Sequence, residues 1–166
     1  MLKVNSKKQT ASLVALGVAL MNFIALAFTI VKGIQEMMSG TDKFFANGYT
    51  LIFSGCPTEL DSIGGWLTIY SRLYFFVAIA IALGLAASFF MKKELDFGKA
   101  GTATTIISSV MAVGYMINGI AANAEVKGYA SSLYFTHYTL AFIPAIIILA
   151  LAGVQFHITR QAKNGF

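Results

Sequence analysis

Four long runs of apolar residues dominate the hydrophobic pattern of this chain. They cover residues 11–31, 66–91, 100–122 and 136–157, and Arg72 is the one charged residue inside them. Each run reaches the about 20 residues that a helix needs to cross roughly 30 Å of hydrocarbon. Inside a bilayer such a run satisfies its backbone hydrogen bonds as a helix, and the runs lack the alternation of barrel strands. The pattern predicts an all-α integral membrane protein with four transmembrane helices in an antiparallel bundle.

The segment between the first two runs, residues 32–65, is the one sizeable stretch outside the spans, and we expect a structured external loop. Within it, residues 49–53 lie between Gly48 and the pair Ser54-Gly55, which fits a short β-strand. Alternatively, this stretch lies in the membrane interface or packs on a neighbouring subunit. The short connection at residues 92–99 favours antiparallel packing of the second and third runs. We treat residues 1–166 as a single four-span membrane domain.

The start of the chain has some features of a secretory signal peptide. Lysines precede the first run, and Ala25-Leu26-Ala27 resembles a cleavage sequence. The apolar run continues beyond the about 7–15 residues that a signal peptide uses. We therefore expect a first span that is retained.

Basic residues are distributed unevenly between the two ends of the predicted bundle. Eight of the twelve lie before the first run, in the 92–99 connection or after the fourth run. Because cytoplasmic loops carry an excess of Lys and Arg, both termini are expected to be cytoplasmic, in a plasma or inner membrane. The net charge of +5 then points to anionic lipid as a partner and not to nucleic acid.

The composition supports the membrane assignment. Apolar residues make up 57% of the chain and charged residues 11%, with a mean hydropathy of +0.73. A soluble domain carries about 25% charged residues, so an ordinary soluble enzyme and a disordered chain are excluded. Cys56 is the single cysteine, which excludes an intrachain disulfide. An intermolecular disulfide and a plain loop thiol remain open.

Polar residues form a stripe on one face of the third run, and a sparser one starts in the first run. The spacings of three and four residues keep the members of the longer stripe on one side of a helix. In hydrocarbon they must face the bundle interior, a partner or water. Hydrogen bonding between helices is one interpretation, and the lining of a pore or substrate path is the other. The members are Thr104, Ser108, Tyr115 and Asn118 in the third run, and Asn22 and Thr29 in the first, with Glu36 seven residues further on.

Arg72 lies about six residues inside the second run, or roughly 9 Å along a helix axis. An arginine side chain can extend that far to reach the interface. A second interpretation pairs Arg72 with Glu36, Glu59 or Asp61, which would pin the external loop to the bundle. A third places Arg72 in an anion-attracting ring of an oligomer.

Aromatic and small residues leave two further questions open. All seven tyrosines, and Trp66, fall in the outer half of the predicted topology. They form either an aromatic belt at the headgroups or an aromatic-lined external vestibule. Two rows of small residues follow the second run at a spacing of four, which indicates close helix contacts in an oligomer or within the bundle. The rows are Ala78, Ala82 and Ala86, and Ala80, Gly84 and Ser88.

No nucleophile elbow, phosphate-binding loop, zinc helix or dinucleotide-binding motif is present in the sequence. His137 and His157 are about 30 Å apart on one predicted helix and cannot share a metal. We therefore expect no enzyme activity, no cofactor and no metal site. The outline resembles the four-span plan of claudins and connexins in topology alone. The external loops of those families carry motif residues and several cysteines, whereas this chain has one tryptophan, Trp66, and one cysteine, Cys56.

Taken together, these features predict a non-enzymatic membrane protein that forms an oligomer and acts as a small channel or pore subunit. The alternative is an accessory or assembly subunit that docks a larger membrane complex through its spans and first external loop. The expected partners are the lipid bilayer and either further copies of the chain or a larger membrane protein.

Overall fold

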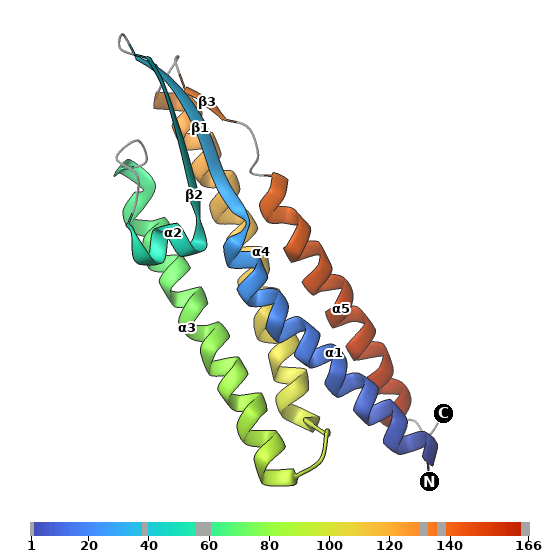
Figure 1. The fold of residues 1–166 in the computed structure, drawn as a ribbon. Coiled ribbons are helices and arrows are strands. Elements are labelled where there is room, and N and C mark those ends of the chain that lie inside the picture. The colour runs from blue at the N-terminus through green and yellow to red at the C-terminus, as the bar shows by residue number, and fades with distance from the viewer. Residues whose placement is uncertain (1, 38–39, 56–60, 130–132, 136–138, 164–166) are drawn as a thin grey trace.

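The computed structural model describes residues 2–37, 40–55, 61–129, 133–135 and 139–163, and side chains within 7–30, 45–55, 65–121 and 140–161. Four long helices dominate it (Figure 1). They are α1 (Leu2–Ala27), α3 (Asp61–Lys92), α4 (Gly98–Tyr129) and α5 (Thr139–Lys163). Each contains a segment of 21 to 28 residues that is long and apolar enough to cross a membrane. The predicted four-span all-α bundle is therefore confirmed.

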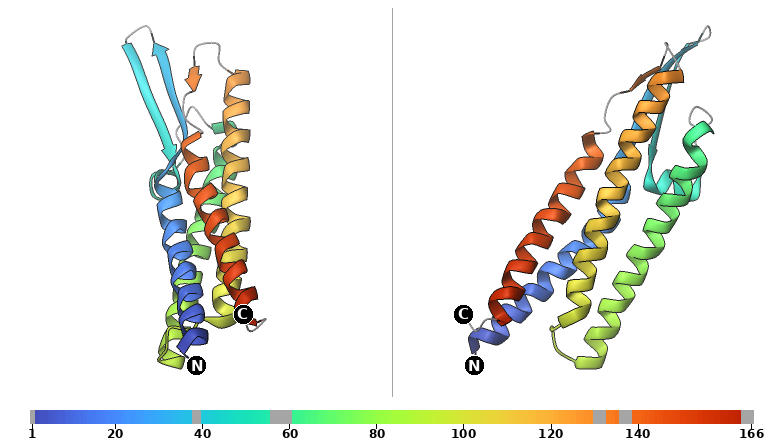
Figure 2. Two further views of the ribbon diagram at one scale, coloured as in Figure 1. Left: turned by 90° about the vertical axis from the view of Figure 1, so that its right-hand side faces the viewer. Right: turned by 180° about the vertical axis from the view of Figure 1, so that it is seen from behind.

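Consecutive spans run in opposite directions, so α1 begins and α5 ends at the same end of the bundle (Figure 1). The connection from α3 to α4 lies at that end as well. We call it the basic end, because the lysine-rich segments lie there. Helices α1 and α4 each contact the other three spans, and α3 and α5 lie on opposite sides of them (Figure 2). This arrangement leaves a large part of α3 and α5 facing outward.

A small antiparallel sheet extends beyond the other end of the bundle. Its strands are β1 (Thr29–Met37), β2 (Gly40–Asn47) and β3 (Leu133–Phe135), in the order β2-β1-β3. The first helix therefore ends at Ala27, four residues before the predicted end of the span. The β-branched run from Thr29 favours extended backbone, and Thr29 pairs with Asn47 of β2. Pairing with a neighbouring strand satisfies the backbone groups that the helix would otherwise have bonded.

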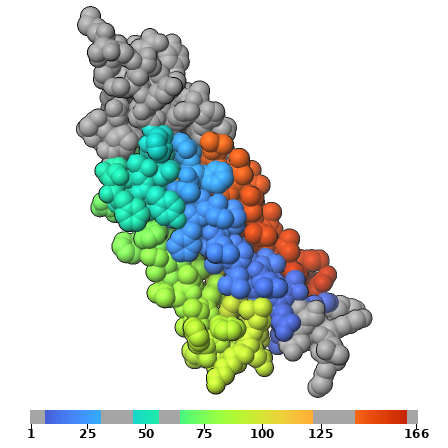
Figure 3. All heavy atoms as spheres, viewed as in Figure 1, coloured from blue at the N-terminus to red at the C-terminus, as the bar shows by residue number. Residues whose placement is uncertain are grey.

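The strand predicted at residues 49–53 is wrong, because these residues form the short helix α2 (Gly48–Phe53). Asn47 caps it: its side-chain oxygen accepts hydrogen bonds from the backbone N–H and the hydroxyl of Thr50. An asparagine at this position favours helix initiation over continuation of β2. Helix α2 is seated over α1 and α3 in the space-filling view (Figure 3). There the Phe53 and Phe75 rings meet edge to face at 6.0 Å.

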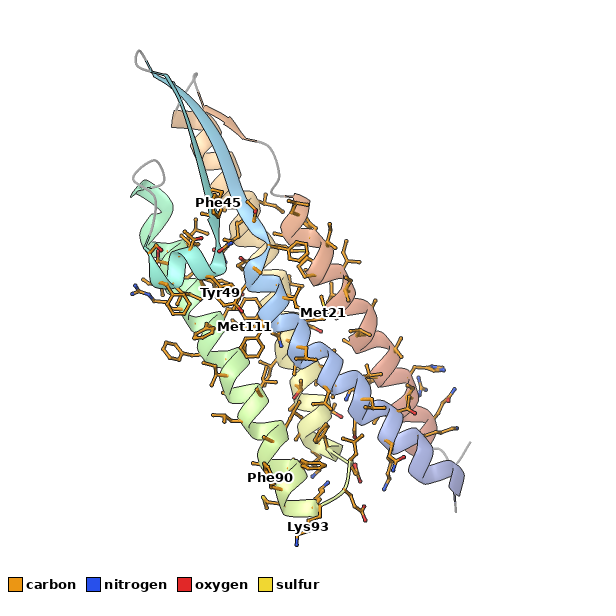
Figure 4. The ribbon with its side chains drawn as sticks, in the orientation of Figure 1. Met21, Phe45, Tyr49, Phe90, Lys93 and Met111 are labelled. Atoms are coloured by element: carbon orange, nitrogen blue, oxygen red, sulfur yellow. The ribbon has the colours of Figure 1, made fainter. Side chains whose placement is uncertain are left out.

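Small residues let the helices approach closely inside the bundle. A methyl group added to Gly114 of α4 would lie 2.1 Å from the hydroxyl oxygen of Tyr70 on α3. That hydroxyl donates a 2.7 Å hydrogen bond to the carbonyl of Met111. Met111 and Met21 lie in the middle of the bundle, on α4 and α1 (Figure 4). The larger of two buried apolar clusters among the described residues therefore depends on close packing between the spans.

The connection from α3 to α4 folds back against the bundle. Lys93 takes a left-handed φ of 53° and ends α3. Phe97 is buried, and its backbone N–H donates a hydrogen bond to the Ser12 hydroxyl of α1. Asp96 forms an ion pair with Lys8 at 3.8 Å. These contacts tie the connection to α1 and set the position at which α4 begins.

Candidate functional site

The predicted stripe of the third span lies inside the bundle. Its members Thr104, Ser108, Tyr115 and Asn118 lie on α4 and are each at most 7% exposed. All four therefore lie on one inward face of α4, as their spacing predicts. They face the interior of a single chain, among α1, α3 and α4.

Asn22 is the centre of a buried polar network that joins three spans. Its side-chain nitrogen donates a 2.7 Å hydrogen bond to the Ser108 hydroxyl of α4. Its side-chain oxygen accepts a 3.0 Å hydrogen bond from the Tyr74 hydroxyl of α3. All three residues are at most 1% exposed. In hydrocarbon these groups have no water to bond, so the network fixes the relative positions of α1, α3 and α4.

Aromatic rings extend the network toward the sheet end of the bundle. The Tyr74 and Tyr115 rings lie edge to face with centroids 5.6 Å apart, and Tyr70 lies edge to face with Tyr74 at 6.4 Å. The Ser71 hydroxyl is buried and has no hydrogen-bond partner among the described residues.

Asn118 forms a second polar contact nearer the sheet. Its side-chain nitrogen donates a 2.8 Å hydrogen bond to the Gly114 carbonyl, and its side-chain oxygen accepts one from the Trp66 indole. Trp66 is 62% exposed, so its ring faces outward while its N–H is held by the bundle. This contact joins the beginning of the α3 span to α4.

Other residues of the predicted site lie elsewhere or outside the described part. Thr29 lies in β1, so it does not continue the face of Asn22 as a helical spacing of seven would require. Arg72 is exposed on α3, as snorkelling requires. Its possible partners Glu36, Glu59 and Asp61 have side chains outside the described set. The pairing of Arg72 with an acid therefore stays a prediction.

The interpretation of the tyrosines as a headgroup belt is wrong for Tyr74 and Tyr115, because both are fully buried between spans. Ser71 and Gln155, which the spacing of polar residues did not single out, are buried without a complete set of hydrogen-bond partners in the described structure. A signal for Gln155 was available, because a glutamine within an apolar span is costly unless its amide is satisfied.

Tyr49 on α2 belongs to the same end of the bundle. Its hydroxyl donates a 2.9 Å hydrogen bond to the Phe23 carbonyl near the end of α1. Burial raises the pKa of Tyr49 above its ordinary value of 10.0. The hydroxyl is therefore neutral near neutral pH and keeps the proton that this bond needs.

The network can hold helices together, and the side chains of its members Asn22, Ser108 and Tyr74 carry no charge. Among the described residues, no group of three or more His, Cys, Asp or Glu side chains could hold a metal ion. His157 is exposed on α5 beside Gln161, with which it shares a 2.8 Å hydrogen bond. His137 and Cys56 lie outside the described residues.

A comparison with known proteins gives no relative for this arrangement. No protein-family model matches the chain, and neither does any curated protein or solved structure.

Proposed function

We propose that this protein is a non-enzymatic membrane subunit that associates with another membrane-spanning chain through the outer face of α3. In this role it is an accessory or assembly subunit whose own bundle is closed. We further propose that it resides in a plasma or inner membrane with both termini in the cytoplasm. The observation that carries the proposal is the pattern of side chains on the outward side of α3.

Helix α3 is the span least covered by the rest of the chain. In its most apolar 18-residue window 22% of the residues are buried, compared with 39% for α1. Its outward residues recur at alternating spacings of four and three, the seven-residue repeat with which helices pack side by side. The repeat consists of Ile69, Leu73, Phe76, Ala80, Leu83, Ala87 and Phe90, all exposed.

Small residues interrupt the large ones at the middle of this face. Ala80, Gly84 and Ala87 are exposed, and nothing lies within 4 Å of the position that a side-chain carbon on Gly84 would occupy. Phe76 and Phe90, 66% and 75% exposed, flank them. Small residues between large ones permit close backbone approach of a second helix.

The buried network favours this role over a pore within one chain. The polar side chains that a pore would need are directed inward and bond to one another, as Asn22 does to Ser108 and Tyr74. Apart from Arg72 near its outer end, the outer face of α3 is apolar, so a channel between copies joined there would lack a continuous polar lining. A channel formed by an oligomer, the first hypothesis from the sequence, is the second candidate function.

Photo-crosslinking in native membranes tests the proposal. A photo-reactive amino acid is placed at position 84 of the full chain, in the cells that make it, and the products are separated by mass after illumination. We expect one discrete protein adduct. A mass twice that of the chain identifies a second copy, and any other discrete mass identifies a different partner.

Position 153 provides the matched control. Gly153 is also an exposed helix glycine with open space around it, but it lies on α5. A crosslinker there should give no adduct of the same mass. Lipid-sized adducts alone at position 84, or identical protein adducts at both positions, would contradict docking through α3.

A further inference from the structure

Two pockets open at the basic end of the bundle. In the ribbon seen from behind, α4 and α5 lie in front of α1 at this end (Figure 2, right). The pockets adjoin one another and have volumes of about 560 and 590 Å³. They share the lining residues Thr102, Ile106, Gln155 and Thr159, so they form one continuous hollow. Each pocket is within the about 300–1,000 Å³ typical of sites for small molecules. We call this hollow the basic-end groove.

The mouth of the groove is positively charged. Lys7, Lys8, Lys99 and Arg160 line it together with one acid, Asp96. Asp96 pairs with Lys8 at 3.8 Å, so the lining retains an excess of positive charge. Both Lys99 and Arg160 are exposed. An anionic group at the mouth would be attracted by these cations at the depth where headgroups lie.

Polarity falls along the groove in the same order on both helices. On α4, Lys99, Thr102, Ile106 and Val110 follow one another on one face over about 16 Å. On α5, Arg160 is followed one turn deeper by Phe156. Ile106, Val110 and Phe156 are 60%, 66% and 68% exposed. Thr105 and Ser109 also line the deeper pocket, but their hydroxyls bond to carbonyls of α4 itself. A charged mouth, a hydroxyl-lined middle and a mainly apolar floor correspond to the headgroup, glycerol and acyl chain of a phospholipid.

Gln155 lies where the two pockets meet and provides an independent indication of a ligand. It is 3% exposed, and its side-chain oxygen is buried without a hydrogen-bond partner among the described residues. A side-chain carbon on Gly101 would come within 3.1 Å of its nitrogen, so a larger residue there would crowd this amide. An unsatisfied amide at this depth is costly. A headgroup hydroxyl that reaches the junction of the two pockets would donate to this oxygen and remove that cost.

We propose that the basic-end groove binds one anionic phospholipid whose headgroup carries a hydroxyl, such as phosphatidylglycerol. The phosphate lies at Lys99 and Arg160, the headgroup hydroxyl donates to Gln155, and an acyl chain follows Ile106, Val110 and Phe156. This site is on the side of α4 and α5, and it does not depend on a partner at α3.

Native mass spectrometry of the full chain in mild detergent tests the site. Phosphatidylglycerol, phosphatidic acid and phosphatidylcholine are added separately, and bound lipids are counted. We expect one phosphatidylglycerol to bind about tenfold more tightly than phosphatidylcholine. Phosphatidic acid, which lacks the headgroup hydroxyl, should bind with intermediate affinity. Equal binding of phosphatidylglycerol and phosphatidylcholine would overturn the proposal.

Three variants locate the binding. Lys99→Gln combined with Arg160→Gln should reduce phosphatidylglycerol binding to the level of phosphatidylcholine. Gln155→Leu should remove the preference over phosphatidic acid while leaving the preference over phosphatidylcholine. Lys93→Gln changes charge at the same end but outside the groove, and it should have no effect (Figure 4). An equal loss with Lys93→Gln would show diffuse surface attraction and overturn the site.

A soluble competitor separates a lipid site from a site for a free anion. Glycerol 3-phosphate supplies the phosphate and hydroxyls without the acyl chain. We expect no displacement of phosphatidylglycerol at millimolar concentration, because the apolar floor contributes to binding. Complete displacement would mean that the groove recognises a soluble phosphate, which would overturn the lipid assignment.

Discussion

Asn22 is the residue at which three spans meet, because its two polar atoms bond to Ser108 of α4 and Tyr74 of α3. Asn22→Ala removes both bonds and leaves two hydroxyls unsatisfied in hydrocarbon. We expect the free energy of unfolding to fall by about 1–3 kcal/mol. Unfolding in mixed micelles of mild detergent and dodecyl sulfate, followed by circular dichroism, measures this loss.

A double-mutant cycle separates the bond from a general effect of truncation. Asn22→Ala and Ser108→Ala should be non-additive, with a coupling energy of about 0.5–1.5 kcal/mol. Ser109→Ala is the matched control, because the Ser109 hydroxyl bonds to the Thr105 carbonyl of its own helix. It should be additive with Asn22→Ala. Additivity at Ser108 as well would remove the proposed link between α1 and α4.

Residue spacing predicted part of this site for a clear reason. Thr104, Ser108, Tyr115 and Asn118 share a face on any regular helix, so their common inward direction followed from the sequence. The spacing of residues along one helix does not identify the neighbouring helix against which that face packs. The role of Tyr74 depends on a partner 52 residues earlier in the chain, so this tyrosine was not distinguishable from a residue in a headgroup belt.

At the scale of the element, helix α2 shows how one capping residue changes the outcome of an apolar pattern. Residues 49–53 have the composition of a strand, but the Asn47 side chain bonds to Thr50 and begins a helical turn. Asn47→Ala removes this cap and should destabilise α2 by about 0.5–2 kcal/mol. Amide hydrogen exchange at residues 50–54 should then be faster by on the order of tenfold.

The substitution Asn47→Asp separates capping from the other contact of this side chain. Aspartate keeps the acceptor for Thr50 but loses the donor that bonds to the Ala27 carbonyl at 3.3 Å. Exchange in α2 should therefore stay close to that of the unmodified protein. Amide exchange in α5, which Asn47 does not cap, should be unchanged in both variants. Equal acceleration with alanine and aspartate would assign the effect to the Ala27 contact.

The small sheet could not be predicted from local pattern for a different physical reason. Strand β3 pairs with β1 through residues such as Phe135 and Gly33, about a hundred positions apart in the chain. An apolar run in a loop does not specify so distant a partner. The continuous hydrophobicity through Val31 also concealed the end of α1, because a helix and a buried strand have similar composition over a few residues.

At the scale of the whole molecule, four spans and their alternating directions followed from hydropathy, because the bilayer permits one solution for an apolar run of this length. The alternating directions of the spans also bring the basic residues together. Three basic segments, at the start of α1, between α3 and α4 and at the end of α5, lie at one end (Figure 1). The excess of basic residues there predicts that this end faces the cytoplasm.

Single-cysteine labelling measures this orientation. In a Cys56→Ser background, Ser54→Cys places a thiol at the sheet end, and Lys93→Cys places one at the basic end; both positions are exposed. A membrane-impermeant maleimide should label Ser54→Cys in intact cells and Lys93→Cys only after the membrane is opened. The reverse pattern would contradict cytoplasmic termini. Labelling of both positions in intact cells would contradict a single orientation, because it requires two populations of the chain inserted in opposite directions.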